Sequence, residues 1–400
     1  MKKMQTIVFL GSRGYGTSHE AIKTAKELGC YTVLISDRYR SGLTEADELI
    51  CVPDLAERNE ILVRLKKLED KGNRIAACLS FIDPYVSCAA QLSEELGLGD
   101  FSSGALALAE DKTAVRNKLK GLKSSPFFSV IDKGIDIRGF ALCHAERFPL
   151  ILKPSVSNGS KDIKLVKSEG EMKEALYAFK DKQPILAEEY LDGPQYLIEA
   201  AVYKGEVLIA AVIEQEWNES FIITGYAFPA ELSRDAALSL TDAVRDIVQH
   251  IGIEHGSCHL EMRYVKGRWK LVEINPRMSG GWMNKIIETG TGGNLLKEVL
   301  KMQLGEEPVF HESIPRSTYA RYLTVNTAGR LLHISGIEQA MNLDGIEHVL
   351  LKTERGCIVR PPKSMGDRFA CIIAAADTMQ HAKKAARDAA KRLRLYVEPL

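Results

Sequence analysis

The sequence lacks several features that would point to particular classes of protein. Lys plus Arg and Asp plus Glu both number 53 in its 400 residues, so no basic excess exists to neutralise the phosphates of a nucleic acid. No apolar run approaches the roughly 18 residues that a transmembrane helix needs, and the N-terminal "TIVFLG" lacks the long apolar segment and cleavage site of a signal peptide. We therefore expect a cytoplasmic protein with no nucleic-acid or membrane partner, whose balanced charge permits a homodimer.

The cysteines also lack a pattern. All eight are scattered, and no C-x-x-C pair occurs among them. Neither a zinc site nor a disulfide framework is indicated, and reduced thiols fit a cytoplasmic protein. Cys258 precedes His259, but neighbouring residues of a strand point to opposite faces, which argues against a thiol nucleophile there.

The first part of the chain, residues 1–108, alternates short apolar runs with helical patterns. This alternation predicts a small parallel sheet covered by helices. The segment "GSRGYG" (11–16) follows the first apolar run, but its spacing is G-x-x-G-x-G and not the G-x-G-x-x-G of dinucleotide-binding loops. A tight strand-to-helix turn is therefore the simpler interpretation.

The rest of the chain has a different pattern, with long apolar strands, intervening helices and two hairpin signals, Lys204-Gly205 and Lys266-Gly267. Mostly antiparallel strands with helices between them predict an α+β fold. The last ninety or so residues, from about 310, form a further domain whose basic helix "MQHAKKAARDAAKRL" is more simply a solvated face than an anion site.

The second hairpin carries three polar groups on one side of an apolar strand. Glu273, Asn275 and Arg277 occupy alternate positions of "KLVEINPRMSGG". The turn at 266–267 places Glu261 of the other arm nearly opposite Glu273. Two carboxylates and an amide oxygen form a hard ligand set that suits Mg²⁺, with Arg277 as a planar cation for phosphate or carboxylate. A solvated surface strand is the alternative, but the adjacent carboxylates would then repel each other without a cation.

Two lysines upstream complete a phosphate site. Lys112 opens a helix, and Lys153 ends a strand just before a glycine-containing turn. A lysine is a compact charge for a polyphosphate, and the backbone N–H groups of such a turn can cradle it. Neither lysine alone indicates a phosphate site, but the two together do.

The order of these motifs between about residues 109 and 305 resembles the ATP-grasp superfamily. The matching motifs are "DK" (111–112), "ILKPS" (151–155), "NGSKDI" (158–163), "AEEYLDG" (187–193), "HLEMR" (259–263) and "LVEINPR" (271–277). Within the superfamily the run 277–307 is similar to bacterial L-amino acid ligases of the bacilysin synthetase type, which make dipeptides, and also to purine-pathway and carboxylase relatives.

The resemblance implies an ATP-grasp fold of two α+β lobes, preceded by the small α/β parallel-sheet domain and followed by a small α+β domain. The implied domains are an N-terminal α/β domain at 1–108, a small lobe at 109–186, a large lobe with the magnesium site at 187–308, and a C-terminal domain at 309–400.

The resemblance also implies roles for individual residues. It assigns ATP binding to Lys112, Lys153, Ser157, Asn158, Gly159, Ser160, Glu188, Glu189, Tyr190, Leu191 and Gln195. It assigns magnesium, as two ions with Mn²⁺ as a substitute, to Glu261, Glu273 and Asn275, and it makes Arg277 the catalytic residue. The candidates for substrate contact are Tyr226, Ser279, Gly280, Gly281 and Trp282, although Trp282 fits packing between lobes equally well.

The implied activity is ATP-dependent, ADP-forming ligation of two L-amino acids through an acyl phosphate. Two departures from the family pattern affect nucleotide affinity and loop closure: Asp162 replaces a glycine of the loop, and Gln195 replaces a ribose-contacting glutamate. The alternatives are an ATP-grasp ligase or carboxylase that acts on another carboxylate, and a nucleotide-binding protein without ligase activity.

Overall fold

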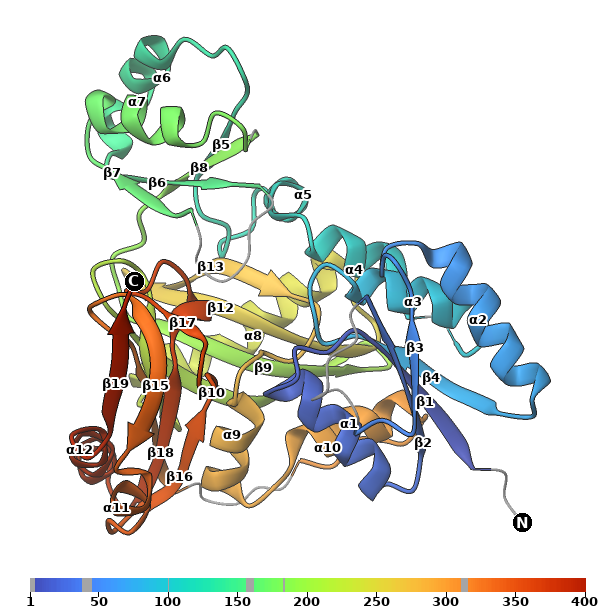
Figure 1. Cartoon of the computed structure of the whole chain (residues 1–400). Coiled ribbons are helices and arrows are strands. Elements are labelled where there is room, and N and C mark those ends of the chain that lie inside the picture. The colour runs from blue at the N-terminus through green and yellow to red at the C-terminus, as the bar shows by residue number, and fades with distance from the viewer. Residues whose placement is uncertain (1–3, 38–44, 100, 156–161, 183, 311–315) are drawn as a thin grey trace.

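The computed structural model of the chain describes residues 4–37, 45–99, 101–155, 162–182, 184–310 and 316–400, and in these residues the strands form four sheets (Figure 1). A small lobe stands above the rest of the molecule, which is built around one large sheet. In this view the N-terminal sheet lies to the right of that large sheet, and the C-terminal part of the chain, which supplies strands to the large sheet itself, lies to the left.

The N-terminal sheet is parallel, in the order β3-β2-β1-β4, as the alternating pattern predicts. Strands β1 and β2 are buried along almost their whole length, which explains why they read as continuous apolar runs. The bounds are β1 Gln5–Leu10, α1 Thr17–Glu27, β2 Tyr31–Ser36, β3 Glu48–Cys51, α2 Arg58–Asp70, β4 Arg74–Leu79 and α3 Val86–Glu95.

The small lobe is an antiparallel sheet in the order β5-β8-β6-β7, with two helices packed on it (Figure 1). Its bounds are β5 Phe128–Ile131, α6 Ile137–Cys143, a 3₁₀ helix Ala145–Arg147, β6 Leu150–Pro154, β7 Lys164–Val166, α7 Glu169–Ala178 and β8 Ile185–Glu189. Two short helices, α4 Ser103–Ala109 and α5 Lys112–Lys118, precede it. Their apolar side chains pack on the core of the large sheet.

The large sheet has eight strands in the order β13-β12-β9-β10-β11-β14-β18-β16. It crosses the expected boundary at 308–309, because β11 pairs with β14 and joins both halves into one sheet. The bounds are β9 Gln195–Tyr203, β10 Glu206–Trp217, β11 Ile223–Phe228, α8 Arg234–Ile251, β12 Gly256–Val265, β13 Arg268–Asn275, α9 Met283–Thr291, α10 Leu295–Gln303, β14 Ser317–Leu323, β16 Ile346–Leu351 and β18 Ala370–Ala376.

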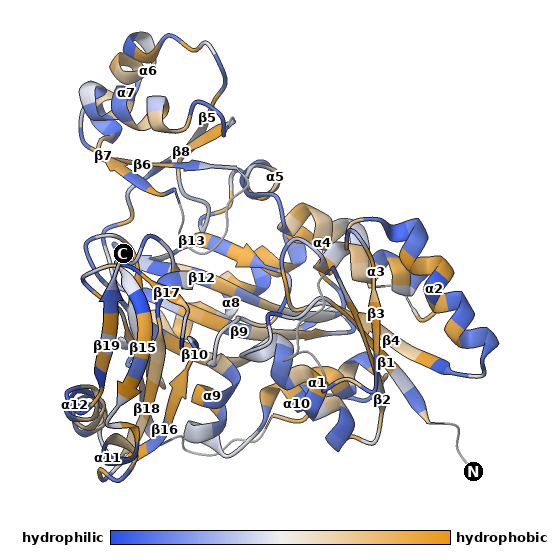
Figure 2. Ribbon diagram, in the orientation of Figure 1, coloured by the Kyte–Doolittle hydropathy of each residue, from blue (hydrophilic) through white to orange (hydrophobic). Residues whose placement is uncertain are grey.

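The C-terminal region adds a three-stranded sheet, β17-β15-β19, and helix α12. The buried side of α12 consists of alanines, and Lys384 and Arg387 are exposed, as expected for a solvated face (Figure 2). Lys383 differs, because it is partly buried and pairs with Glu216 at 2.7 Å. The bounds are β15 Gly329–Ser335, α11 Ile337–Met341, β17 Ile358–Val359, a 3₁₀ helix Met365–Asp367, α12 Met379–Ala390 and β19 Arg394–Pro399.

None of the helices in the described residues has the length and apolar character needed to cross a bilayer. All eight cysteines are free thiols, four of them buried. Cys258 is fully buried, and burial together with the nearby Glu199 raises its pKa to about 12, so it is not an activated nucleophile.

Candidate functional site

Two cavities meet at the carboxylates of the second hairpin. The inter-lobe cavity, of about 100 Å³, lies between the small lobe and the large sheet, and Lys112 and Lys153 are among its lining residues. The central cavity, of about 370 Å³, is lined by residues from the N-terminal domain, the large sheet and the C-terminal region. Glu261 and Glu273 line both cavities. A group bound between these two carboxylates would therefore contact ligands on either side.

The hairpin geometry depends on a turn and a bulge. The predicted turn is present at Lys266 and Gly267, which both have positive φ values (49° and 75°), as a two-residue hairpin turn requires. Regular pairing from this turn would place residue 272 opposite Glu261. A bulge between Glu261 and Met262 shifts the register, so that Glu261 pairs with Glu273 and His259 with Asn275. The bulge thus places the two carboxylates side by side.

The donor set at this point fits a magnesium ion. Glu261, Glu273 and Asn275 all line the central cavity. Among the described residues no group of three or more His, Cys, Asp or Glu side chains could hold a metal ion, so a metal here would be held by two carboxylates and an amide oxygen. Mg²⁺ is usually bound by one or two carboxylates together with phosphate and water oxygens.

Glu261 is oriented by two buried amides. Gln195 Nε2 donates to one carboxylate oxygen at 3.2 Å and Gln215 Nε2 to the other at 3.3 Å. Burial and the adjacent Glu273 carboxylate raise the pKa of Glu261 to about 7. A cation bound here would stabilise the ionised form of Glu261.

Gln195 lies in the inter-lobe cavity, but its amide is occupied by protein groups. Its Oε1 accepts from Arg263 Nε at 2.9 Å, while its Nε2 also donates to Gln215 Oε1 at 2.8 Å. The guanidinium of Arg263 lies over the Trp217 ring, 4.5 Å from its centroid. The structure therefore places Gln195 as a link between Arg263 and Glu261, a role that the sequence did not indicate.

Lys153 is held in place by a buried charge cluster that includes Arg116, which the sequence analysis did not single out. Lys153 Nζ lies 2.8 Å from Glu188 Oε2, and Arg116 Nε donates to the other oxygen of Glu188. Arg116 also donates to the Val272 carbonyl at 2.6 Å, which ties the small-lobe strand β8 to β13. The Glu188 side chain is thus committed to positioning Lys153. Glu188 also lines the inter-lobe cavity, and its contact to the nucleotide stays a prediction.

The other residues expected at the nucleotide lie in the same cavity. Lys112 Nζ lies 3.2 Å from Glu273 Oε1. Glu189, Tyr190 and Leu191 line the cavity where the chain leaves β8. The Glu189 side chain accepts from the Phe127 N–H, and the Leu191 carbonyl accepts from Arg263.

The expected phosphate loop is only partly described. Ser157, Asn158, Gly159 and Ser160 lie outside the described residues. Asp162, the departure from the family pattern, has a φ of 62°, in the region that favours glycine. Its carboxylate lies 2.7 Å from Lys182 Nζ, so an ion pair within the small lobe offsets its charge.

Arg277 is paired with a residue from the N-terminal domain. Its Nε donates to Asp83 Oδ1 at 2.8 Å, and its second terminal nitrogen donates to Oδ2. Burial raises the pKa of Asp83, but the Arg277 charge outweighs burial and holds the pKa below its usual value. The backbone carbonyl of Arg277 is hydrogen-bonded to His259 Nδ1 at 2.8 Å. Burial, and after it the Arg277 charge, lowers the pKa of His259 to about 4. His259 is therefore neutral at pH 7.

The loop after Arg277 packs against the N-terminal glycine loop. The Thr17 N–H donates to the Gly281 carbonyl at 2.9 Å, and its hydroxyl donates to the Ser279 carbonyl at 2.8 Å. A Cβ atom at Gly16 would lie 2.2 Å from the carbonyl oxygen of Gly281, so only glycine fits. This contact explains the last glycine of "GSRGYG": the turn closes the wall of the central cavity.

The remaining substrate candidates surround the same cavity. Ser279, Gly280, Gly281, Trp282 and Tyr226 all line it. The Trp282 ring lies between Tyr15 and Tyr322, with centroids 6.1 and 6.0 Å away. Trp282 is thus both a packing residue between the parts of the chain and a wall of the cavity.

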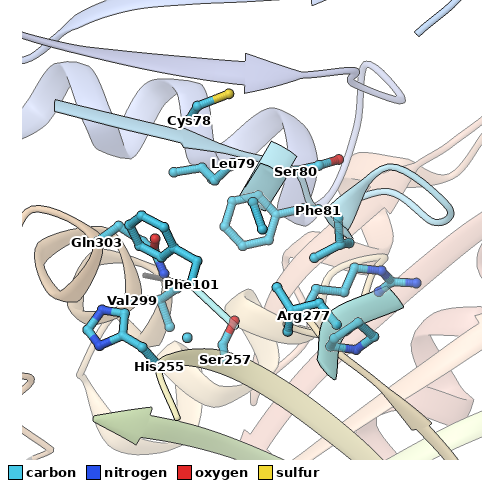
Figure 3. Close-up of a pocket in the computed structure, with 15 residues that line it drawn as sticks. Cys78, Leu79, Ser80, Phe81, Phe101, His255, Ser257, Arg277, Val299 and Gln303 are labelled. Carbon is cyan, nitrogen blue, oxygen red and sulfur yellow. The ribbon is translucent and has the colours of Figure 1, made fainter. Parts of the chain in front are cut away.

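A third, smaller cavity lies behind the Arg277 backbone, between β4, α3, α4, α10 and β12. It measures about 50 Å³, and Figure 3 shows Phe81, Phe101, Val299 and Ser257 among the residues around it. Mostly apolar side chains line this void, so it offers few polar groups to orient a ligand.

Glu199 is a buried carboxylate that sequence analysis missed. Its side chain is 0% exposed and accepts from the Ser279 N–H at 3.0 Å. Its other oxygen has no hydrogen-bond partner among the described residues. Burial raises the pKa of Glu199 to about 7. A single charged residue in the apolar run "YLIEAAV" was the signal available in the sequence.

The raised pKa of Glu199 gives a stability prediction. A folded-state pKa above the unfolded value contributes stability that is present below about pH 4.5 and is lost as pH rises towards 7. We expect Glu199→Gln to become more stable relative to wild type between pH 5 and pH 8, by an amount on the order of 3 kcal/mol. Urea unfolding at both pH values measures the difference, with the exposed Glu206→Gln as control. A difference that does not change with pH would contradict this prediction.

Two family models match parts of the chain. Residues 146–286 match the ATP-grasp domain, and residues 321–398 match the L-amino acid ligase C-terminal domain 2. The chain is 25% identical over 308 residues to dapdiamide A synthase of Enterobacter agglomerans, covering 69% of this chain and 72% of the synthase. It is 26% identical over 268 residues to carnosine synthase 1 of Gallus gallus, covering 61% of this chain and 29% of that protein. The chain spans half or less of the length of the first curated relatives that it matches.

Among solved structures, an L-amino acid ligase from Bacillus licheniformis superposes with a TM-score of 0.83 over the whole length of both chains, at 19% identity. The predicted fold is therefore confirmed: the small and large lobes form an ATP-grasp fold, preceded by a parallel-sheet domain. The chain therefore has the ATP-grasp fold, carries a segment that matches the ATP-grasp domain, and is similar to the L-amino acid ligases.

Proposed function

We propose that this protein is an ATP-dependent, ADP-forming carboxylate–amine ligase that joins two L-amino acids. The observation that carries the proposal is the meeting of two cavities at Glu261 and Glu273. One cavity carries lysines suited to a polyphosphate and the other carries Arg277. A phosphoryl group bound at the junction would reach a carboxylate in the central cavity. The similarity to dapdiamide and carnosine synthases and to an L-amino acid ligase agrees with this chemistry.

ATP would bind in the inter-lobe cavity, with Lys112 and Lys153 directed at its phosphates. Glu188 holds Lys153 without using all three of its N–H groups. Mg²⁺ held by Glu261, Glu273 and Asn275 would neutralise charge on the phosphates during transfer. The product of the first step is an acyl phosphate on the substrate in the central cavity.

In the second step the amine attacks the acyl phosphate and phosphate leaves. Arg277 would stabilise the oxyanion of the tetrahedral intermediate, since it lines the cavity beside the metal ligands. Asp83 fixes the plane of its guanidinium through two hydrogen bonds, so little reorganisation is needed. Walls from three parts of the chain would exclude water from the acyl phosphate.

The test is phosphate release from ATP and Mg²⁺ with all pairwise mixtures of the twenty L-amino acids, with products identified by mass. The expected result is release that requires two amino acids and a product with a dipeptide mass. Binding of ATP without release for any pair would overturn the dipeptide proposal. It would leave an ATP-grasp ligase for another acid, or a nucleotide-binding protein, as the function to examine.

A further inference from the structure

The wall of the central cavity formed by the C-terminal region carries two cations that the proposed reaction does not use. Lys352 and Arg368 both line this cavity, and neither lines the inter-lobe cavity. They therefore belong to a different cavity from Lys112 and Lys153, and the two cavities share Glu261 and Glu273. Residues 364–366 also line the cavity, and none of them carries a carboxylate.

Arg368 is fixed in place by neutral groups. Its Nε donates to the Met365 carbonyl at 3.1 Å, and one terminal nitrogen donates to the Ile223 carbonyl at 3.0 Å. The guanidinium lies 3.8 Å from the centroid of the Tyr322 ring and also hydrogen-bonds Tyr226. A guanidinium has five N–H donors, so these contacts leave capacity for a ligand.

Lys352 is held in a similar way. Its Nζ donates to the Gly366 carbonyl and lies 5.3 Å from the centroid of the Tyr15 ring. Among the described residues, neither Lys352 nor Arg368 has a carboxylate within ion-pair distance. The three acidic residues that line the cavity have other partners: Asp83 binds Arg277, Glu273 contacts Lys112, and Glu261 accepts from two glutamine amides.

A cation that is partly withdrawn from water and has no counter-ion is unfavourable unless a ligand supplies the negative charge. In the proposed reaction the lysines of the inter-lobe cavity bind the phosphates. The carboxylate to be activated lies beside Glu261, Glu273 and Arg277. The charge missing at the C-terminal wall is therefore that of a second anionic group within the substrates.

We propose that Lys352 and Arg368 form a subsite for a substrate carboxylate that takes no part in the reaction. This inference rests on the proposed ligase function and names the second recognition element of the same cavity. The carboxylate has two sources: the free α-carboxylate of the amino acid whose amine attacks, or a side-chain carboxylate of the amino acid that is activated. No bond forms or breaks at this subsite.

The two sources are distinguished by substrates. In the first arm, each attacking amino acid is compared with its α-amide; in the second, an activated acid with a carboxylate side chain is compared with its side-chain amide. We expect one of the two replacements to lower kcat/KM roughly 10- to 100-fold, as loss of hydrogen bonds to a charged group does. Equal use of acid and amide in both arms, by an enzyme that is otherwise active, would overturn the subsite.

Variants test whether these side chains are responsible. In Lys352→Gln and Arg368→Gln, KM for the carboxylate-bearing substrate should rise roughly 10-fold or more, KM for ATP should stay unchanged, and the preference for acid over amide should disappear. Lys363→Gln, an exposed lysine of the same segment, is the matched control. Equal loss with acid and amide would indicate a structural role and overturn the proposal.

A binding measurement separates this inference from the ligase function. Thermal unfolding of the full chain with Mg²⁺ and ADP is followed with each L-amino acid and with its α-amide. Even if no pair of amino acids gives ADP release, a rise in Tm with the acids that is absent with the amides and absent in Lys352→Gln supports the subsite. Tm values that do not distinguish acids from amides would overturn it.

Discussion

Replacing Glu273 with glutamine is expected to lower kcat for ligation on the order of 10³-fold, because a bound metal ion supplies several kcal/mol of charge stabilisation in the transition state. Glu273 lines both cavities and lies opposite Glu261 in the hairpin, so it is a direct candidate ligand. The half-saturating concentration of Mg²⁺ should rise in the same variant. Initial rates of phosphate release across a Mg²⁺ titration measure both quantities.

The stability of this variant separates loss of the metal site from loss of the fold. Glu273→Gln removes the repulsion from Glu261 but also the ion pair with Lys112, and these effects oppose each other, so the variant should unfold close to the wild-type temperature when Mg²⁺ is absent. Added Mg²⁺ with ADP should raise the Tm of wild type more than that of the variant. Glu338→Gln, on the exposed side of α11, serves as control. Activity within about tenfold of wild type, with unchanged Mg²⁺ dependence, would remove Glu273 from the metal site.

The pairing of the two carboxylates could be predicted from the sequence because it depends on local geometry. A turn at Lys266-Gly267 fixes which residues of the two arms face each other, and side chains of a strand alternate between its faces. The bulge could not be predicted, because nothing in "KLVEIN" marks Val272 as an extra residue without a partner opposite it. The prediction placed Glu261 nearly opposite Glu273, and the bulge shifts the pairing by the one residue needed to make them partners.

Contacts between distant segments could not be predicted in the same way. Asp83 and Arg277 are 194 residues apart, and "FIDPY" around Asp83 reads as an ordinary turn after a strand. Gln195 could be compared only with the family pattern, which suggested a ribose contact. In the structure its amide joins Arg263 to Glu261 through the packing of β9 against β12. The partners of a polar side chain depend on tertiary register, which a single sequence leaves open.

The part that the C-terminal region plays in the site could not be predicted either, because it too depends on contacts between distant segments. Lys352 and Arg368 stand in polar segments with no motif of their own. They reach the central cavity only because β14 pairs with β11, which continues the large sheet into the C-terminal region. A boundary drawn at 308–309 hides this continuity.

Arg277→Lys is expected to lower kcat roughly 10²- to 10³-fold, the effect of removing one oxyanion donor. The charge would remain, but a lysine cannot reproduce the planar, two-point contact with Asp83 and still face the cavity. We expect KM for ATP to change little, because Arg277 does not line the inter-lobe cavity. Steady-state rates with each substrate varied in turn measure this division.

Because Arg277 is paired with Asp83, a loss of activity in an Arg277 variant could arise from lost stability as well as from lost catalysis. Removing one side of a buried ion pair costs about 3–5 kcal/mol, because the other charge is left without a partner, so Arg277→Ala alone would lose activity through instability. Arg277→Ala combined with Asp83→Ala leaves no uncompensated charge and should regain stability without regaining activity. Urea unfolding and kcat of the two single variants and the double variant form a cycle that separates the two roles. If the double variant recovered the wild-type rate, Arg277 would be a structural partner of Asp83 and not the catalytic residue.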